Sequence, residues 1–448
     1  MDHSTLGGAR RLIPRSKLNP SSGSNGRPRF GWRWFLQLLL VLAGIFCCYR
    51  LAVSSVATGA SRLFSMIAIF DGSVEPTDKA VHFAPNDPEA HYTRALSLVN
   101  AQRLDEALQE LRVATQLRPH HYYEWLDLAV TLDRMGDQTG ASDALKTSIQ
   151  LAPSFAQPRW QLGNLLYRQG RIEEGFAELR LAAKSNPNLF RGMVDLASAV
   201  APDDRTLEAL VQPQTRRSRL ELAKFLATRG DGVAAANAVQ QAGEPTIDLE
   251  VALLREIISE LLAAKQFSEA RAVWMVTHPL AKGATDLILN GDFMDPIKQD
   301  DPGFGWQITS VPNVAVSIDP AGPASQTRSV RLEYGGDSVP QMQPIKQLIL
   351  VKPKSRYTLT FMARTEGLVS GGPPIVLVSD SSSAVVRSLG QSSSLNSQQG
   401  SWNAFQVDFS TDDPASAVVI GLQRLPCSQS PCPIFGRLWL SRFLLVKS

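Results

Sequence analysis

Residues 122–155 have the sequence YYEWLDLAVTLDRMGDQTGASDALKTSIQLAPSF, and its pattern recurs on both sides. Prolines recur at one constant step, at Pro85, Pro119, Pro153 and Pro187. Small residues and leucines keep the same step, at Ala95, Ala129 and Gly163, at Ala107, Ala141 and Gly175, at Ala114, Ser148 and Ala182, at Leu98, Leu132 and Leu166, and at Leu111, Leu145 and Leu179. A fixed period of roughly 34 residues predicts structural units that stack on one another.

Each unit is predicted to be two antiparallel helices, because one such pair cannot bury its apolar face alone. The units run over 88–121, 122–155 and 156–189, and proline ends the second helix of each. They resemble the tetratricopeptide repeat family, whose pattern is best matched in the middle unit by Trp125, Ala129, Ala141 and Pro153. The position of Trp125 is taken by His91 in the first unit and by Arg159 in the third.

Helical patterning extends beyond these three units. Residues 58–87 are predicted to hold a connecting segment and an incomplete first repeat, with its second helix over Val74–Phe83. Residues 190–284 are predicted to form degenerate helical repeats, including hairpins over 220–242 and 253–277. Within them, residues 201–215 carry two prolines and two adjacent aspartates, and they are expected to be the most loop-like part.

The N-terminal region predicts a membrane anchor. Residues 1–33 carry seven basic side chains against one acidic, and they are predicted to be a disordered cytoplasmic tail. An apolar run follows over Trp34–Tyr49, and 34–57 is predicted to cross a lipid bilayer as one helix. A cleaved secretory signal peptide and a buried soluble helix are the alternatives. The basic tail places the rest of the chain outside the cytoplasm.

The character of the sequence changes at about residue 285. Short alternating runs appear between clusters of Gly, Pro, Ser and Asp, and they predict strands over Val314–Ile318, Ser329–Glu333, Tyr357–Arg364, Ile375–Ser379, Asn403–Phe409, Ala417–Gln423 and Arg437–Val446. Many short strands with such turns predict a β-sandwich or jelly roll over 285–448. The fold class is therefore multidomain, with one transmembrane helix, an all-α solenoid and an all-β sandwich.

Three phrases make the last region similar to galactose-binding-like jelly rolls that serve as carbohydrate-binding modules in bacterial proteins. They are LNGDF over 289–293 with GW over 305–306, VKP over 351–353 with YTLTFMAR over 357–364, and LWLSRF over 438–443. The resemblance implies a possible polysaccharide ligand. Members of this family often carry a structural calcium, but Met294 and the Ser441-Arg442 pair stand where its acidic ligands tend to lie. No metal and no cofactor are therefore expected.

Composition and motifs exclude several functions. The chain has 448 residues and a net charge of +3, of which the tail supplies +6, so the remainder is net −3 and no nucleic-acid partner is expected. The six histidines form no HExxH pair, and neither a phosphate-binding glycine loop nor a GxSxG turn occurs. The chain is accordingly predicted not to be an enzyme, with a hydrolase in the sandwich as a remote alternative.

The first helices of the units are expected to line a groove that binds an extended peptide of a partner protein. Asn100, Arg134 and Arg168 occupy one equivalent row by phase, with Tyr92, Asn164 and Tyr167 nearby. Guanidinium groups in such a row suit carboxylates or peptide backbone. The alternative is that the row is an ordinary solvated helix face.

The sandwich offers two further candidates. Trp306 and Tyr334 follow or precede glycine-rich loop sequence and are predicted to form a glycan-stacking platform, although core packing is the alternative for each tryptophan. Trp402 and Trp439 lie in alternating phrases and are expected in the core. Cys427 and Cys432 bracket a short loop and are predicted to form a disulfide, with two free thiols as the alternative.

This layout resembles membrane-anchored tetratricopeptide proteins associated with bacterial exopolysaccharide or cell-envelope biogenesis. The resemblance implies an inner-membrane, single-pass protein with a cytoplasmic N-terminus and periplasmic domains. Its expected function is a non-catalytic scaffold whose repeats bind a partner protein and whose sandwich binds a glycan. The alternative is a purely structural assembly factor without affinity for sugar.

Overall fold

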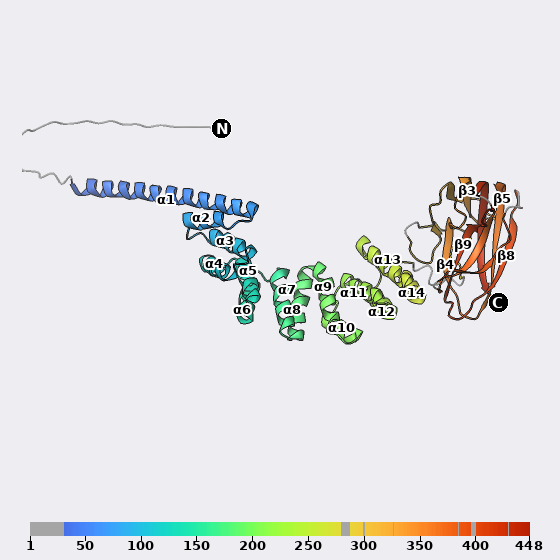
Figure 1. Ribbon diagram of the computed structural model, residues 1–448, viewed down its shortest axis with the longest axis horizontal. Helices are drawn as coiled ribbons and strands as arrows, with labels where there is room; N and C mark the ends of the chain where they lie inside the picture. The colour runs from blue at the N-terminus through green and yellow to red at the C-terminus, as the bar shows by residue number, and fades with distance from the viewer. Residues whose placement is uncertain are drawn as a thin grey trace, which may run out of the picture. The chain divides into compact units, whose positions relative to one another are not determined.

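The computed structural model describes residues 31–278, 287–298, 301–325, 327–383, 385–395, 400–428 and 430–448 (Figure 1). The disordered tail predicted over 1–33 falls almost wholly outside the described residues. So does the predicted boundary between residues 284 and 285. The chain divides into two compact units, Met1–Leu151 and Ala152–Ser448.

The first unit begins with a single long helix, α1 (Gly31–Asp71). Its 41 residues correspond to about 60 Å, roughly twice the thickness of a bilayer core. The apolar side chains over 34–56 are exposed, whereas Ser61, Ser65 and Ala68 are buried where the helix packs on α2 and α3. The apolar segment after residue 57 therefore continues the same helix and opens the solenoid.

Helix pairs follow at a constant spacing (Figure 1). The first unit contains α2 (Glu75–Phe83), α3 (Pro88–Asn100), α4 (Leu104–Leu117), α5 (Tyr122–Arg134) and α6 (Gln138–Leu151). The second unit opens with α7 (Ala156–Arg168) and α8 (Ile172–Ser185). In the pairs α3–α4, α5–α6 and α7–α8, the first helix has 13 residues and the second has 14.

The turn between the paired helices explains part of this regularity. Gln102, Gly136 and Gly170 occupy the same position in successive repeats, and each has a positive φ, of 61°, 86° and 76°. Glycine adopts this conformation without a steric penalty, so two of the three turns use it. Leu98 and Leu132 lie in the first helices and Leu111 and Leu145 in the second, and all four are buried where the paired helices meet.

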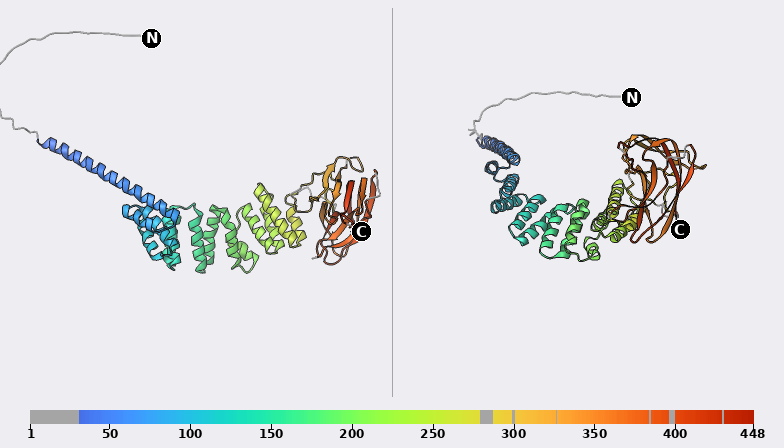
Figure 2. Two further views of the ribbon diagram at one scale, coloured as in Figure 1. Left: turned by 45° about the horizontal axis from the view of Figure 1, so that its top comes forward. Right: turned by 45° about the vertical axis from the view of Figure 1, so that its right-hand side comes forward.

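The second unit continues with helices of less regular length. They are η1 (Pro187–Leu189), α9 (Phe190–Ser198), α10 (Asp204–Val211), α11 (Arg216–Thr228), α12 (Gly232–Ala242), α13 (Asp248–Ala263) and α14 (Phe267–Trp274) (Figure 2). Residues 201–215, which were expected to be the most loop-like part of this region, hold α10 at their centre. Asp203 caps this helix by accepting from the backbone N–H of Thr206 at 2.8 Å.

The C-terminal region is antiparallel β-structure. Its strands are β1 (Gln307–Ile308), β2 (Val314–Asp319), β3 (Ser329–Asp337), β4 (Ile345–Leu350), β5 (Arg356–Ser370), β6 (Pro374–Asp380), β7 (Arg387–Gln391), β8 (Asn403–Ser410), β9 (Ala417–Arg424) and β10 (Pro433–Lys447). They form two five-stranded sheets, in the orders β1-β4-β9-β6-β7 and β2-β3-β10-β5-β8.

Both sheets contribute to one core, which makes the region a β-sandwich. Val330 and Leu332 of β3 pack in the same cluster as Ile345 and Ile349 of β4. These residues alternate along each strand, as expected for one face turned inward. The jelly-roll assignment stays a prediction.

Candidate functional site

The described part of the predicted peptide groove in the first unit is organised by a hydrogen bond between adjacent repeats. The phenol of Tyr92, on α3, donates to Oδ2 of Asp127, on α5, at 2.6 Å. Both side chains are half-buried. Burial raises the pKa of Asp127, and the hydrogen bond from Tyr92 and the positive charge of Arg134 act against that rise. Tyr92, Asp127 and Arg134 therefore form one electrostatically coupled group.

The row predicted from the repeat phase ends each first helix. Asn100 is the last residue of α3, Arg134 the last of α5 and Arg168 the last of α7. All three side chains are exposed. Asn100 and Arg134 belong to the first compact unit and Arg168 belongs to the second, so the row is divided between the two units.

The remaining groove candidates, Asn164 and Tyr167, take part in local packing. The amide of Asn164 donates to the backbone oxygen of Trp160 at 2.8 Å within α7. The ring of Tyr167 meets Phe176 of α8 edge-on, with 6.2 Å between centroids. Both side chains remain half-buried, so each presents only part of its surface.

The sequence analysis missed Asp127 as part of this group. Its signal was an acidic residue between Leu126 and Leu128, which are both buried. A carboxylate in the middle of an amphipathic helix requires a partner or exposure to water. The phase alone could not supply that partner, since Tyr92 lies 35 residues earlier on a different helix.

The prediction that Trp306 and Tyr334 form an exposed glycan platform is wrong. Trp306 is 4% exposed, donates from its indole to the backbone oxygen of Asn290, and packs against Phe293 and Phe443. Tyr334 is 5% exposed and follows Val330 and Leu332 on the inward face of β3. Burial of their large apolar surface stabilises the sandwich and removes both rings from contact with ligand.

Trp439 is buried, as predicted, but lies on the outer face of its sheet. Its neighbours Leu438 and Leu440 belong to the sandwich core, and side chains alternate along a strand. The Trp439 indole donates to Oδ2 of Asp319 at 2.9 Å, and the guanidinium carbon of Arg364 lies 4.1 Å from its ring centroid.

The same guanidinium also faces a second tryptophan. Arg364 lies 5.8 Å from the ring centroid of Trp402, which is half-buried rather than in the core. Two aromatic rings thus flank one cation on the outer face of the sheet β2-β3-β10-β5-β8. The sequence analysis assigned no role to Arg364, because its partners come from β10 and from the residue preceding β8.

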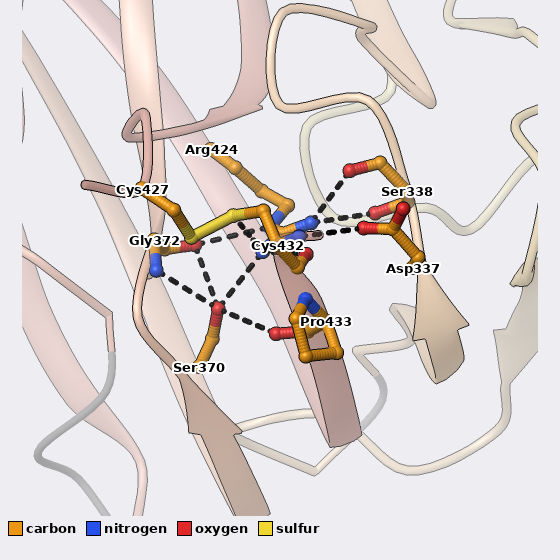
Figure 3. Close-up of a disulfide and its surroundings, with 8 residues drawn as sticks. All are labelled: Asp337, Ser338, Ser370, Gly372, Arg424, Cys427, Cys432 and Pro433. Carbon is orange, nitrogen blue, oxygen red and sulfur yellow. Dashed lines mark hydrogen bonds between the residues drawn. A yellow bond between two sulfur atoms is a disulfide. The ribbon is translucent and has the colours of Figure 1, made fainter. Parts of the chain in front are cut away.

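A disulfide joins Cys427 and Cys432, the pair for which the sequence favoured one. Arg424 lies beside it and is 4% exposed (Figure 3). Its guanidinium donates to the backbone oxygens of Gly372, Ser338 and Cys432 at 2.8–3.0 Å. Burial lowers the pKa of Arg424, but the surrounding oxygens satisfy its donors, so this cluster is a structural element.

Within the described ranges, no group of three or more His, Cys, Asp or Glu side chains could hold a metal ion. Asp292, the acidic residue of the LNGDF phrase, accepts only a long contact of 3.5 Å from the backbone N–H of Met294.

Three known proteins share sequence with part of the chain. DnaJ homolog subfamily C member 3 from Homo sapiens is 31% identical over 102 residues, which are 23% of this chain and 20% of that protein. Protein O-mannosyl-transferase TMTC1 from Homo sapiens is 32% identical over 135 residues, 29% of this chain and 14% of that protein. TPR repeat-containing protein PA4299 from Pseudomonas aeruginosa is 36% identical over 87 residues, which are 19% of this chain and 36% of that protein. No family model matches the chain.

Solved structures give matches of low overall similarity. YrrB, described as a TPR protein with an unusual peptide-binding site, has 16% identity and a TM-score of 0.31, and covers 41% of this chain and 90% of its own. PilF from Pseudomonas aeruginosa has 16% identity and a TM-score of 0.30, and the match covers 52% of this chain and 95% of PilF. MamA from Desulfovibrio magneticus has 17% identity and a TM-score of 0.29, and the match covers 42% of this chain and 93% of MamA.

The chain spans about a fifth of DnaJ homolog subfamily C member 3, a seventh of TMTC1 and a third of PA4299. The regularly spaced helix pairs and the match to a TPR repeat-containing protein define the class of its helical region. This region is a solenoid of the tetratricopeptide type, followed by antiparallel β-sheets.

Proposed function

We propose that the chain is a membrane-anchored, non-catalytic scaffold whose helical repeats bind an extended segment of a partner protein. The observation that carries this proposal is the coupled group formed by Tyr92, Asp127 and Arg134 on the first helices of adjacent repeats. The group offers both an exposed guanidinium and a half-buried carboxylate. These are suited to hydrogen bonding along a peptide backbone and to pairing with its charged side chains.

The anchor in this proposal is the first part of α1. It is the one described helix that is long and apolar enough to cross a membrane, and the share of its apolar window buried by protein is 0%. An apolar helix that no protein surface covers is stabilised by lipid. We assign the cytoplasmic side to the basic N-terminus and the extracytoplasmic side to the repeats and the sandwich, as at a bacterial inner membrane.

The binding proposal is tested by recovering partners from solubilised membranes with the full-length chain. Replacing Arg134 and Arg168 by Ala should strongly reduce the recovery of a specific partner, because both guanidinium groups end first helices and are exposed. Lys146→Ala is the matched control, since Lys146 is an exposed cation on the second helix α6. Unchanged recovery with the double replacement would remove the groove from the proposal.

A second proposal concerns the sandwich, and the arrangement of Trp402, Arg364 and Trp439 favours it. We propose that the half-buried Trp402 offers a glycan-stacking surface whose orientation Arg364 fixes. Such a site would suit a role in exopolysaccharide or cell-envelope biogenesis. The alternative is that the protein is a structural assembly factor without affinity for sugar.

The glycan proposal is tested on a panel of bacterial polysaccharides with the full-length chain. Trp402→Ala should abolish retention without changing the fold, whereas Val386→Ala, at an exposed apolar residue elsewhere, should leave retention unchanged. A chain that binds no polysaccharide on the panel would leave the sandwich as a structural or protein-docking domain.

A further inference from the structure

A pocket of about 400 Å³ lies in the second unit, among helices α8, α9, α10 and α11. Its walls are mainly apolar and include Phe190 and Met193 of α9 and Val211 at the end of α10. Leu181 of α8 also lines it and is 42% exposed. Its volume falls within the range of about 300–1,000 Å³ typical of ligand pockets.

The pocket has a structural cause in the length of α10. The second helices α4, α6 and α8 each have 14 residues, but α10 has only 8. At about 1.5 Å per residue, α10 is about 9 Å shorter than its counterparts. The surface of α8 that a full-length second helix would cover is left open. The loss of the repeat phase after Pro187 therefore creates a concave surface.

Helix α10 ends at a residue in an unfavourable backbone conformation. Gln212 ends the helix with a φ of 44°, in the left-handed region that non-glycine residues rarely adopt. Pro213 follows and cannot donate to a helix. Gln212 itself lines the pocket.

The polar groups of the pocket have a strong excess of positive charge. Arg180, Lys184 and Arg217 line it, against one carboxylate, Glu221. Arg180 donates to the backbone oxygen of Leu210 at 2.7 Å, and Arg217 donates to the side-chain oxygen of Asn188 at 2.9 Å. Across the described ranges, none of these three cations forms an ion pair with a carboxylate.

Arg217 also has unused hydrogen-bonding capacity. Its Nε is buried and has no hydrogen-bond partner in the part of the chain that the structure describes. The guanidinium as a whole is half-buried and lines the pocket, so its charge is available to a carboxylate of the ligand. An apolar cavity surrounded by unpaired cations matches a ligand that combines one bulky apolar group with several carboxylates.

We propose that this pocket binds an acidic peptide segment through one large apolar side chain, with Lys184 and Arg217 pairing its flanking carboxylates. The inference rests on the proposed function, because it names a second contact for a protein partner. It differs from the groove in place and in chemistry. The groove candidates lie on the first helices α3, α5 and α7, whereas this pocket is formed by the second helix α8 together with α9, the end of α10 and the start of α11.

The test uses the full-length chain in detergent and a fluorescein-labelled peptide with one phenylalanine between glutamates. The peptide should bind with a Kd of about 1 mM or tighter, and binding should weaken as salt rises. Lys184→Glu and Arg217→Gln should each raise the Kd by about tenfold or more, equivalent to about 1.4 kcal/mol. Leu181→Ser should also weaken binding, because it removes part of the apolar wall.

Matched controls make the outcome decisive. Lys146→Glu reverses an exposed cation on α6 and should leave the Kd unchanged. A peptide with serine in place of phenylalanine, and one with glutamines in place of glutamates, should both bind at least about tenfold more weakly. Thermal unfolding of each variant confirms its folding. The charge-conserving Lys184→Arg should retain binding if the reversal variant loses it.

Three results overturn the proposal. One is a Kd that the Lys184 and Arg217 variants leave unchanged. Another is a peptide that loses its affinity with Arg134→Ala instead, which would assign it to the groove. Recovery of a partner from membranes through Arg134 and Arg168, together with no binding of the acidic peptide, would refute the pocket and leave the proposed function intact.

Discussion

His91 and Trp125, which occupy the same position in consecutive repeats, make the same hydrogen bond. Nε2 of His91 lies 2.9 Å from the backbone oxygen of Pro85, and the indole of Trp125 donates to that of Pro119 at 2.8 Å. Each ring therefore ties the first helix of its repeat to the proline that ends the preceding second helix. His91 departs from the family pattern at the position of Trp125, but it keeps this contact with the proline.

The residue at the equivalent position of the second helix also differs between the repeats. Nδ1 of His91 lies 2.6 Å from Oε2 of Glu110, and in the third repeat Arg159 donates to Glu178 at 2.8 Å. Glu110 and Glu178 occupy the same repeat position, where the middle repeat has Ala144. The basic side chains of His91 and Arg159 are thus matched by a carboxylate on the second helix, whereas the repeat with the larger Trp125 has an alanine at that position.

The first prediction concerns the pH dependence of stability. The hydrogen bond to Glu110 raises the pKa of His91 above its usual value, against the effect of burial. Because the folded pKa is raised, the pair stabilises the protein fully below the unfolded value of about 6.5 and loses this contribution as pH rises through the folded pKa. The free energy of unfolding, measured between pH 5 and 9, should therefore fall over that window.

The control copies the middle repeat into the first. His91→Trp combined with Glu110→Ala should remove this pH dependence while preserving the hydrogen bond to Pro85. An NMR titration of His91 in the unmodified chain should show a raised pKa. A value at or below that of an exposed histidine would contradict the pairing.

The second prediction concerns Tyr92 and Asp127. Tyr92→Phe should destabilise the first unit by about 1–3 kcal/mol, because it leaves a half-buried carboxylate without its donor. Combining Tyr92→Phe with Asp127→Leu should cost less than the sum of the two single changes, since both polar partners are then absent. Denaturant unfolding of the four chains measures the coupling, and additive effects would show that the hydrogen bond contributes little.

The third prediction separates two tryptophans of the sandwich. Trp306→Ala should cost about 3–5 kcal/mol, because it empties a site packed by Phe293 and Phe443. Trp402→Ala should cost only about 1 kcal/mol, since its ring is half-buried and faces the guanidinium of Arg364. Thermal unfolding of the sandwich transition compares them, and equal losses would contradict the difference in burial.

The fourth prediction concerns the cysteines. In native envelopes, Cys427 and Cys432 should react with an alkylating reagent only after a reductant is added, because they are joined in a disulfide. Cys47 and Cys48 are free and serve as the internal comparison once the membrane is solubilised. Peptide mapping by mass spectrometry locates the label, and labelling of Cys427 without reductant would argue against the disulfide in the cell.

The fifth prediction is the orientation in the membrane. A reporter that is active only outside the cytoplasm should be active when fused after Ser448, because the basic residues precede the apolar helix. The same reporter fused before Met1 should be inactive. The reverse pattern would overturn the proposed orientation, and release of a shorter soluble chain would favour a cleaved signal peptide.

The helical repeats follow from the amino-acid sequence alone, because their period arises from constraints that act locally along the chain. Proline, the small residues and leucine each act within one helix pair, and the same pair is then stacked again. The first helices of the pairs accordingly begin at equivalent positions, at Pro88, Tyr122 and Ala156. Several strands were likewise predicted near their observed positions, as for β2, β6 and β9.

Elements without a strong local signal were missed. Helix α10 lies in a segment rich in turn-forming residues, and it is stabilised by Leu207 and Val211, which pack into a core formed by α8, α9 and α11. Strand β7 has exposed or half-buried residues throughout, so its sequence lacks alternation, and its pairing with β6 defines it. In both cases the favourable contacts are with residues distant in sequence.

Which side chains are available for binding depends on packing between elements that lie far apart in the sequence. Trp306 follows a loop-like sequence but is buried in the core, and Trp439 lies in a regular strand but faces outward against Arg364. Asp127 gained its partner from another repeat, and the pocket beside α8 arose because α10 is short. Composition and spacing determine which groups can form an element, whereas burial and pairing between elements determine which of those groups a ligand can reach.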